Sequence, residues 1–218
     1  MNRTIVVATR NRGKAAEFRA MLAPLGLEVK TLADFPDGAV PEVEEDGETF
    51  SENALKKARS AALALGLPAL ADDSGLCVNA LGGEPGVRSA RYAGEPADDA
   101  RNNAKLLAEL RARGAQAAAP DGTPALSPAR FVCALALYDP ADESVLAAEG
   151  ACEGWIVPEA RGSGGFGYDP LFYVPALGKT FGEAAPEEKH RLSHRGAALR
   201  GLADKLAARL SAARTQDA

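Results

Sequence analysis

The sequence predicts an α/β fold in which part of the sheet is parallel. Residues 4–9, TIVVAT, form an apolar, β-branched run typical of a buried strand, and residues 67–71 form a second apolar run. Up to the second run, the segments follow the order strand, helix, strand, loop, helix, strand. Ligands of such sheets collect at the carboxyl ends of the strands. The residues that follow the two apolar runs are therefore the first candidates for a functional site.

Capping and spacing signals divide the rest of the chain into elements. Thr49 and Glu52 form a capping box, which predicts the start of a long helix. Leucines three and four residues apart, from Leu199 onward, predict an amphipathic last helix. Residues 114–129 are interpreted as a flexible surface loop and residues 214–218 as a frayed tail. The expected helices cover residues 14–22, 50–65, 98–113 and a segment from about 193, and the expected strands cover residues 4–9, 28–32, 67–71, 130–138 and 144–154.

Composition argues against several classes of protein. The 218 residues carry a net charge of -5, which disfavours nonspecific nucleic-acid binding, and their number suits a single domain of two lobes over residues 1–218. No apolar run reaches the roughly 20 residues that a membrane span needs. The N-terminal segment lacks the apolar core of a signal peptide, so we expect a cytoplasmic protein without a membrane partner. The three cysteines share no metal-type spacing and are expected to be buried free thiols.

The first candidate motif is RNRGK, which follows the first strand. A glycine-containing loop with a lysine at a helix start offers backbone N–H groups, a helix dipole and an ammonium to a phosphate. The motif lacks the glycine spacing and the Ser/Thr of a Walker A loop, and alone it also fits an ordinary strand–helix turn. Its residues are Arg10, Asn11, Arg12, Gly13 and Lys14.

Acidic residues form the second candidate site. Asp72 and Asp73 close the second apolar run, and no basic residue occurs between Lys30 and Lys56, a stretch that contains Glu45. Two carboxylates at a partly buried strand end would repel each other without a counter-cation. Mg²⁺, which takes oxygen ligands, suits such a site. Taken alone, the acidic loop fits a solvated surface segment better than a metal site.

The third candidate is SGGFGYDP, residues 163–170. Glycines on either side of Phe166 and Tyr168 would let exposed aromatic rings and main-chain groups grip a flat ring. The alternative is a plain turn with core aromatics.

The fourth candidate is EEKHRLSHR, residues 187–195. It concentrates positive charge at the expected start of the last helix, which the helix dipole disfavours. A bound anion would resolve this conflict, and a solvated basic turn is the alternative. Together the four motifs predict a Mg²⁺-dependent protein that acts on a nucleoside phosphate.

These segments resemble the inosine triphosphate pyrophosphatase family, the HAM1-like pyrophosphatases of deaminated purine nucleotides. The resemblance covers nearly the whole chain and rests on ATRNRGKAAEF, EDGETFSENALKKA, ADDSGLCVNALGGEPGVRSARYAG, GGFGYDPLF and EEKHRLSHRG, in family order. It implies an elongated, two-lobed α/β structure with a long mixed twisted sheet, flanking helices and a central cleft. It also implies a homodimer that hydrolyses ITP, dITP and XTP to the monophosphate and pyrophosphate, with one or more Mg²⁺ ions per subunit.

The resemblance assigns roles residue by residue. It makes Asp73 the general base, Glu45 and Asp73 the metal ligands with Asp72 as a possible third, and Lys14, Lys57 and Lys189 the groups that stabilise the leaving pyrophosphate. Arg10 departs from the family pattern, which has a small residue there. The implied substrate-binding residues are Thr9, Asn11, Lys14, Lys57, Ser74, Phe166, Gly167, Tyr168, Asp169, Lys189, His194 and Arg195.

The expected site could select among purine bases by hydrogen bonding, and two other functions are alternatives for the chain. A donor such as Arg195 aimed at the 6-oxo group of the base would reject adenine. A Maf-like pyrophosphatase of pyrimidine or modified nucleotides would share the fold, but the FGYD and SHR segments favour purines. A non-catalytic nucleotide-binding module is disfavoured because Asp73 and Glu45 are both present.

Overall fold

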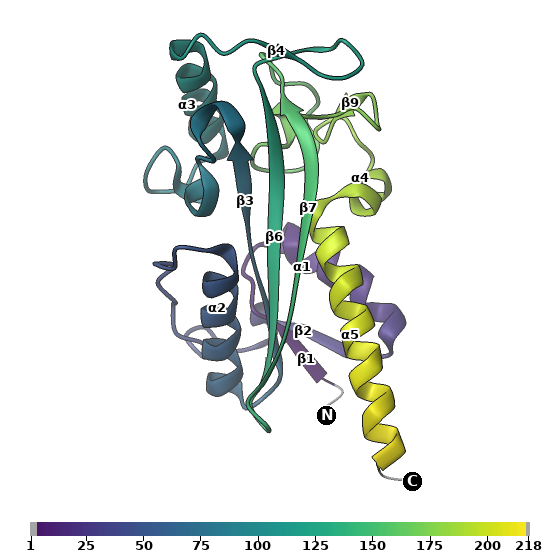
Figure 1. Ribbon diagram of the computed structural model, residues 1–218. Coiled ribbons are helices and arrows are strands. Elements are labelled where there is room, and N and C mark those ends of the chain that lie inside the picture. Colours follow the sequence, from purple (N-terminus) through teal and green to yellow (C-terminus); the bar gives the residue numbers. More distant parts are fainter. Residues whose placement is uncertain (1–3, 217–218) are drawn as a thin grey trace. The chain divides into compact units, whose positions relative to one another are not determined.

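The computed structural model describes residues 4–216, without the side chains of Arg12, Met21 and residues 210–216 (Figure 1). The strands are β1 (Thr4–Val7), β2 (Glu28–Thr31), β3 (Ala69–Val78), β4 (Ala117–Ala118), β5 (Pro124–Ala125), β6 (Ser127–Asp139), β7 (Ser144–Ile156), β8 (Phe172–Val174) and β9 (Lys179–Thr180). The α-helices are α1 (Arg12–Leu22), α2 (Phe50–Leu65), α3 (Asp99–Ala112), α4 (Pro186–Leu192) and α5 (His194–Gln216).

The predicted α/β class and its long mixed sheet are confirmed. Seven strands form one sheet in the order β2-β1-β3-β6-β7-β8-β9, and β4 and β5 form a separate antiparallel pair. Strand β1 is parallel to both β2 and β3, as the alternation of strands and helices predicted. Strands β7, β8 and β9 pair antiparallel. Strands β6 and β7 are neighbours joined by only four residues, so they form a hairpin.

The chain divides into two compact units. Within the described residues, unit 1 comprises residues 4–73, 133–150 and 197–216, and unit 2 comprises residues 74–132 and 151–196. Strands β3, β6 and β7 each contribute residues to both units.

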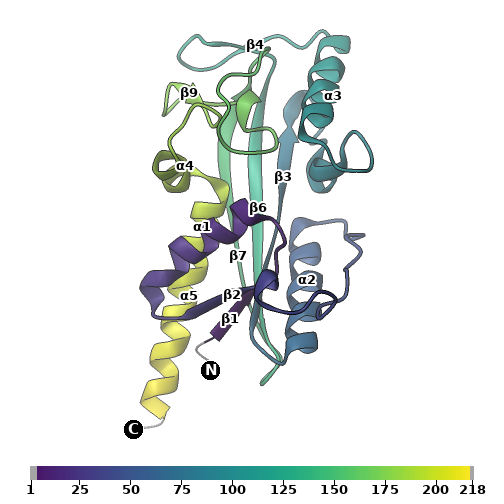
Figure 2. The same cartoon turned by 180° about the vertical axis from the view of Figure 1, so that it is seen from behind.

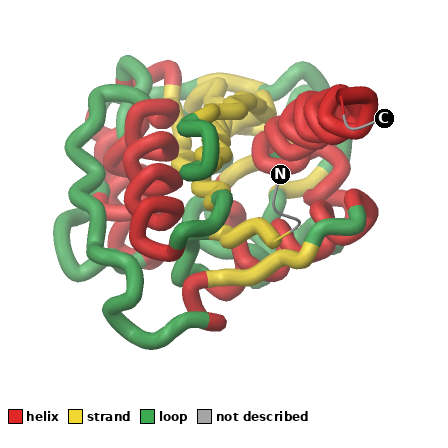
Figure 3. The backbone as a smooth tube through the Cα atoms, turned by 90° about the horizontal axis from the view of Figure 1, so that it is seen from below, coloured by secondary structure: helices red, strands yellow, loops and turns green. Residues whose placement is uncertain are grey.

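Successive side chains of a strand point to opposite faces of the sheet, and unit 1 buries both of these faces. On one face Ile5, Val7 and Leu70 pack with Phe18 of α1 and Leu202 of α5. On the other face Ala69, Ala71 and Ala134 pack with the buried alanines of helix α2. Figures 1 and 2 show this helix beside the strands from opposite sides. Seen from below, in Figure 3, strands lie beside α5, whose end carries the C label. The buried alanines of α2 are Ala54, Ala58, Ala61 and Ala62.

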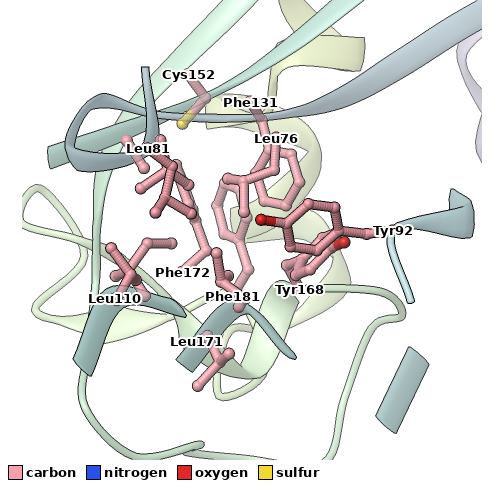
Figure 4. Packing of buried hydrophobic residues seen from close by; sticks show 14 of the residues in the cluster. Leu76, Leu81, Tyr92, Leu110, Phe131, Cys152, Tyr168, Leu171, Phe172 and Phe181 are labelled. Carbon is pink, nitrogen blue, oxygen red and sulfur yellow. The ribbon is translucent and has the colours of Figure 1, made fainter. Parts of the chain in front are cut away.

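Unit 2 has an aromatic core of its own (Figure 4). The rings of Phe131 and Phe172 lie 4.5 Å apart between centroids, and Phe172 also contacts Phe181 at 5.3 Å. Helix α3 closes this core with Leu106 and Leu110, which are fully buried. The stretch between β3 and α3 folds into short 3₁₀ helices, including residues 86–91.

Several sequence-based boundaries differ from the structure. Strand β3 does not end at the acidic pair but continues through it to Val78. Residues 114–129 hold the β4–β5 pair and the first residues of β6 instead of an irregular loop. Helix α5 includes residues 214–216 of the expected frayed tail, and residues 217–218 lie outside the described part. Within residues 4–216, no helix is long and apolar enough to span a membrane.

The basic segment is also arranged differently from the prediction. Residues 186–192 form a separate helix, α4, and Ser193 separates it from α5. Lys189, His190 and Arg191 occupy the last turn of α4, while Glu187 and Glu188 occupy its first turn. The helix dipole favours both arrangements, so the predicted electrostatic conflict does not exist for these lysine, histidine and arginine side chains.

Candidate functional site

Strand alternation separates the two carboxylates of the acidic pair. Leu70 belongs to the apolar cluster that contains α1, and Ala71 to the cluster that contains α2. Asp72 therefore faces the same side as Leu70, and Asp73 the same side as Ala71. Their partners agree: Lys14 of α1 donates to Asp72 at 2.8 Å, whereas Asn53 and Lys57 of α2 donate to Asp73 at 3.2 and 3.3 Å.

The pair lies just beyond the end of β1. Val7, the last residue of β1, pairs with Leu70, and the N–H of Ala8 donates to the carbonyl of Leu70 at 2.7 Å. The chain then turns into α1, which Asn11 caps by accepting from the N–H of Lys14. This places the RNRGK segment next to the acidic pair, as the parallel arrangement predicted. Gly13 lies inside the helix, not in a loop.

The acidic loop is tied to the first turn of α2. Asn53 accepts from the N–H of Gly47 at 2.8 Å, and the predicted capping box between Thr49 and Glu52 forms. These bonds fix the loop, so that Glu45 accepts from Lys57 at 3.0 Å. Lys57 thus contacts Glu45 and Asp73 together, and its side chain is only 17% exposed.

Glu45, Lys57 and Asp72 line one pocket of about 230 Å³ in unit 1. Its wall includes residues of three sequence motifs that lie far apart in the chain. An exposed ion pair between Arg10 and Glu42, 3.5 Å apart, belongs to the same wall. The polar lining residues are Thr9, Arg10, Lys14, Glu42, Glu45, Lys57 and Asp72. The side chain of Arg12 lies outside the described part of the structure.

Burial and charge shift two pKa values in this cluster. Burial, reinforced by the nearby charge of Glu45, raises the pKa of Asp73 although Lys57 opposes the change. Burial works against the charged form of Lys57, but Asp73, Glu45 and Asp72 together raise its pKa. The cluster carries one net negative charge when all five of its groups are ionised. These groups are Lys14, Lys57, Glu45, Asp72 and Asp73.

A divalent cation fits the convergence of Glu45 and Asp73. Lys57 already places a positive charge on both carboxylates, which shows that the two acids can share one cation. Among the described residues, no group of three or more His, Cys, Asp or Glu side chains forms a metal cage. Mg²⁺ does not need one, because it binds through one or two carboxylates and completes its shell with water and substrate phosphate.

Unit 2 gathers cations around an aromatic ring. The ammonium of Lys189 lies 4.5 Å from the ring centroid of Phe166, and the guanidinium of Arg195 lies 5.7 Å from it. Arg195 also donates to the hydroxyl of Ser74 at 3.2 Å. Residues of three predicted motifs, Ser74, Phe166 and Arg195, therefore meet here. The ring and the hydrogen-bonding groups are what a nucleobase requires.

Asp169 organises the loop that carries Phe166. Its carboxylate accepts from Lys189 at 2.6 Å and from the N–H of Phe166 at 2.8 Å. The side chains of Lys189 and Asp169 are only 8% and 4% exposed, so the two charges form a buried pair. Lys189 is therefore engaged with Asp169 and Phe166, in contrast to its expected role at the leaving pyrophosphate.

Two predicted substrate contacts are core residues. Tyr168 is 4% exposed, lies in the apolar cluster of Figure 4 and donates to the carbonyl of Ser89 at 2.8 Å. The expectation of two exposed aromatics is wrong for Tyr168, because its ring fills the core instead. His194 is 5% exposed and stacks on Phe131 with ring centroids 4.8 Å apart.

The sequence and the fold of this chain are similar to those of known proteins. The model of the Ham1 family matches residues 5–205. A dITP/XTP pyrophosphatase of Geobacillus kaustophilus is 54% identical over 91% of this chain and 91% of its own, and one of Geobacter sulfurreducens is 52% identical over 93% and 96%. The structure of a HAM1 protein from Coxiella burnetii is 43% identical, with a TM-score of 0.82 over 95% of this chain and 99% of its own. The chain belongs to the Ham1 family.

Membership of the Ham1 family confirms the resemblance drawn from the five sequence segments. Sequence reasoning missed Asn53, which holds both Gly47 and Asp73. A signal existed, because Asn53 lies four residues before Lys57 and so shares its helix face. It also missed Asp99 and Asn103, which contact Gly167 from helix α3. No local pattern could have indicated these contacts.

Proposed function

We propose that this chain is a divalent-metal-dependent pyrophosphatase that hydrolyses dITP, XTP and ITP to the nucleoside monophosphate and pyrophosphate. Two kinds of observation support the proposal. Relatives with about half of their residues identical are dITP/XTP pyrophosphatases. The observation that carries it is the sharing of one cation, Lys57, by Glu45 and Asp73. Lys57 and Glu45 line a pocket together with Lys14.

Glu45 and Asp73 are the residues proposed to hold Mg²⁺, with Asp72 as a further candidate. Bound Mg²⁺ supplies positive charge to the phosphate oxygens. Lys14 and Lys57 provide additional positive charge for the phosphates and for the leaving pyrophosphate. Asp72 holds Lys14 in place through the 2.8 Å contact.

Asp73 is proposed to accept the proton of the attacking water. The water oxygen forms a bond to the α-phosphorus, the α–β anhydride bond breaks, and the electron pair of that bond leaves with pyrophosphate. Burial raises the pKa of Asp73, which strengthens it as a base once ionised. Asn53 donates to Asp73 at 3.2 Å and thereby orients the carboxylate.

Unit 2 is proposed to recognise the purine. Phe166 offers its ring, and Arg195 and Ser74 offer hydrogen-bond donors near it. A 6-oxo purine presents an acceptor where adenine presents an amino group, so a fixed donor favours the former. One mismatched buried hydrogen bond costs roughly 1–3 kcal/mol, which is about tenfold to a hundredfold in selectivity.

The test is pyrophosphate release from dITP, XTP, ITP, dATP, dGTP, dTTP and dCTP, with Mg²⁺ and with chelator. The proposal requires release from the first three nucleotides, much slower release from dATP and dGTP, and loss of release in chelator. Release from pyrimidine nucleotides alone would favour a Maf-like activity. Binding of dITP without any release would favour a nucleotide-binding module.

Two further features are proposed from the family resemblance: a homodimer and a cytoplasmic location. Light scattering of the purified protein tests the first, and cell fractionation tests the second. A monomer over the whole concentration range used for the assay would contradict the dimer.

A further inference from the structure

Helix α3 clamps one glycine of the Phe166 loop by both of its main-chain groups. The N–H of Gly167 donates to Oδ2 of Asp99 at 2.7 Å. The carbonyl of Gly167 accepts from Nδ2 of Asn103 at 2.9 Å. Asp99 and Asn103 are four residues apart and so lie on one face of the helix. Gly167 is the residue between Phe166 and Tyr168, so the clamp acts next to the ring proposed to meet the base.

The loop needs such an anchor because its backbone is intrinsically free. Gly165 and Gly167 have φ values of 74° and 62°, in the left-handed region that glycine adopts readily. On the N-terminal side of Phe166, Asp169 accepts from the main-chain N–H of Phe166. The clamp from α3 and the bond from Asp169 therefore fix the backbone on both sides of Phe166.

Helix α3 is a rigid support for this clamp. Asp98 caps it by accepting from the N–H of Arg101 at 2.7 Å. Asn102, which is 2% exposed, bonds the main chain at Ala93 and Ala90. Leu106 and Leu110 bury the helix in the aromatic core. The position of α3 is thus set independently of Asp99 and Asn103.

The carboxamide of Asn103 carries a feature that stability alone does not explain. Its Oδ1 atom is buried and has no hydrogen-bond partner among the described residues. A buried acceptor without a partner is destabilising, and asparagine is a poor residue for a helix interior. The Nδ2 atom of Asn103 donates to the carbonyl of Gly167.

We propose that Asp99 and Asn103 are positioning residues that set the orientation of the Phe166 ring and so determine affinity and selectivity for the purine base. They act through Gly167 and do not contact the substrate. This inference rests on the proposed function, because it assigns a role within the same base-recognition site.

The test compares Asp99→Ala, Asp99→Asn and Asn103→Leu in the full-length protein. Asp99→Ala removes both the acceptor and the charge near the start of the helix, whereas Asp99→Asn removes the charge but keeps an acceptor oxygen. We expect Asp99→Ala and Asn103→Leu to raise KM for dITP about tenfold, since each loses one hydrogen bond to the loop. We expect kcat to change little, discrimination against dATP to narrow, and Asp99→Asn to recover most of the affinity.

Hydrogen exchange of the metal-free, nucleotide-free protein provides a second readout. Amides of residues 163–169 should exchange faster in Asp99→Ala and Asn103→Leu than in the wild type. The exchange rates of Asp99→Asn should lie between those of the wild type and those of the other two variants. Unchanged exchange and unchanged KM would overturn the inference. So would a fall in kcat at constant KM, or an Asp99→Asn variant as impaired as Asp99→Ala. If the wild type releases pyrophosphate normally but the variants give one of these contradicting results, only this inference fails. If the wild type releases none from any nucleotide, the proposed function fails, and the role in base recognition fails with it.

Discussion

The ammonium of Lys57 lies 3.3 Å from Oδ1 of Asp73, with the Lys57 side chain 17% exposed and the Asp73 side chain 8% exposed. The same ammonium contacts Glu45, so a single lysine pairs with two carboxylates. Without it, two like charges would face each other in a partly buried site. Lys57 is therefore expected to support the metal-free fold as well as the phosphates.

Replacement of Lys57 by methionine should destabilise the metal-free protein. It leaves Glu45 and Asp73 without their shared cation, and breaking a buried pair costs about 3–5 kcal/mol. We expect a value near the lower end, because Glu45 is 30% exposed, and a fall in Tm of roughly 6–12 °C. Mg²⁺ should raise the Tm of Lys57→Met more than that of the wild type.

Lys56→Met is the matched control for this prediction. Lys56 is the next residue of the helix, and its ion pair with Asp46 is about half exposed. Thermal unfolding should show little change for this variant. Equal losses in Lys56→Met and Lys57→Met would contradict the assigned role of Lys57.

The stability of the metal-free protein should depend on pH through Asp73. Its pKa is raised by burial and by Glu45, so the folded state holds the proton more tightly than the unfolded state. The contribution of Asp73 to stability is complete below the unfolded pKa of 3.8 and is lost as pH rises through the folded pKa. Asp73→Asn does not titrate. Its free energy of unfolding should therefore increase relative to the wild type from about pH 4 to about pH 7, in chelator.

Asp34→Asn is the control, because the pH dependence of its effect on the free energy of unfolding should have the opposite sign. A backbone hydrogen bond from Thr31 lowers the pKa of Asp34, so its contribution is present above pH 3.8 and is lost as pH falls through the lowered pKa. Chemical unfolding at several pH values measures both variants. A difference between Asp73→Asn and the wild type that stays constant with pH would refute the raised pKa.

Two glycines of the Phe166 loop should respond differently to alanine. A Cβ at Gly165 would collide with the carboxylate of Asp169, whereas a Cβ at Gly167 would meet no atom within 4 Å. Gly167→Ala should cost only about 1–2 kcal/mol for its left-handed backbone. Gly165→Ala should cost more and raise KM, because it displaces the Asp169–Lys189 pair. Similar Tm and KM values for the two variants would show that Asp169 does not hold the loop.

Arg10 should affect substrate binding more than stability. Its ion pair with Glu42 joins side chains that are 61% and 92% exposed, so Arg10→Asn should change the free energy of unfolding by less than about 1 kcal/mol. Because Arg10 lines the pocket with Lys14 and Lys57, we expect KM to rise roughly threefold, with a weaker dependence on salt. Arg200→Asn, at an exposed position of α5, is the control for loss of positive charge. A KM equal to that of the wild type would place Arg10 outside the site.

Local signals allowed much of unit 1 to be predicted. The apolar run at residues 4–9 and the capping box at Thr49 lie where β1 and α2 begin. The end of β3 was missed because Asp72 and Asp73 interrupt its apolar pattern, although the strand continues through them. Helix α4 was missed even though Pro186 followed by two glutamates is a helix-start signal.

The different partners of Asp72 and Asp73 are explained by the structure of strand β3, which the sequence did not reveal. The family resemblance assigned the base to Asp73, and alternation along β3 explains why Asp72 contacts Lys14 while Asp73 contacts Lys57. The contacts of Gly167 with Asp99 and Asn103 span more than 60 residues of chain. No periodicity or capping pattern encodes such a contact, so it could not be predicted.

Pyrophosphate release from dITP by Asp73→Asn, with saturating Mg²⁺, tests the central claim most directly. The account predicts a kcat about 100-fold to 10,000-fold below that of the wild type, because the proton acceptor is removed. Asp204→Asn, at an exposed position of α5, should retain the wild-type rate. A kcat for Asp73→Asn within a few fold of the wild type would contradict the assignment of Asp73 as the base.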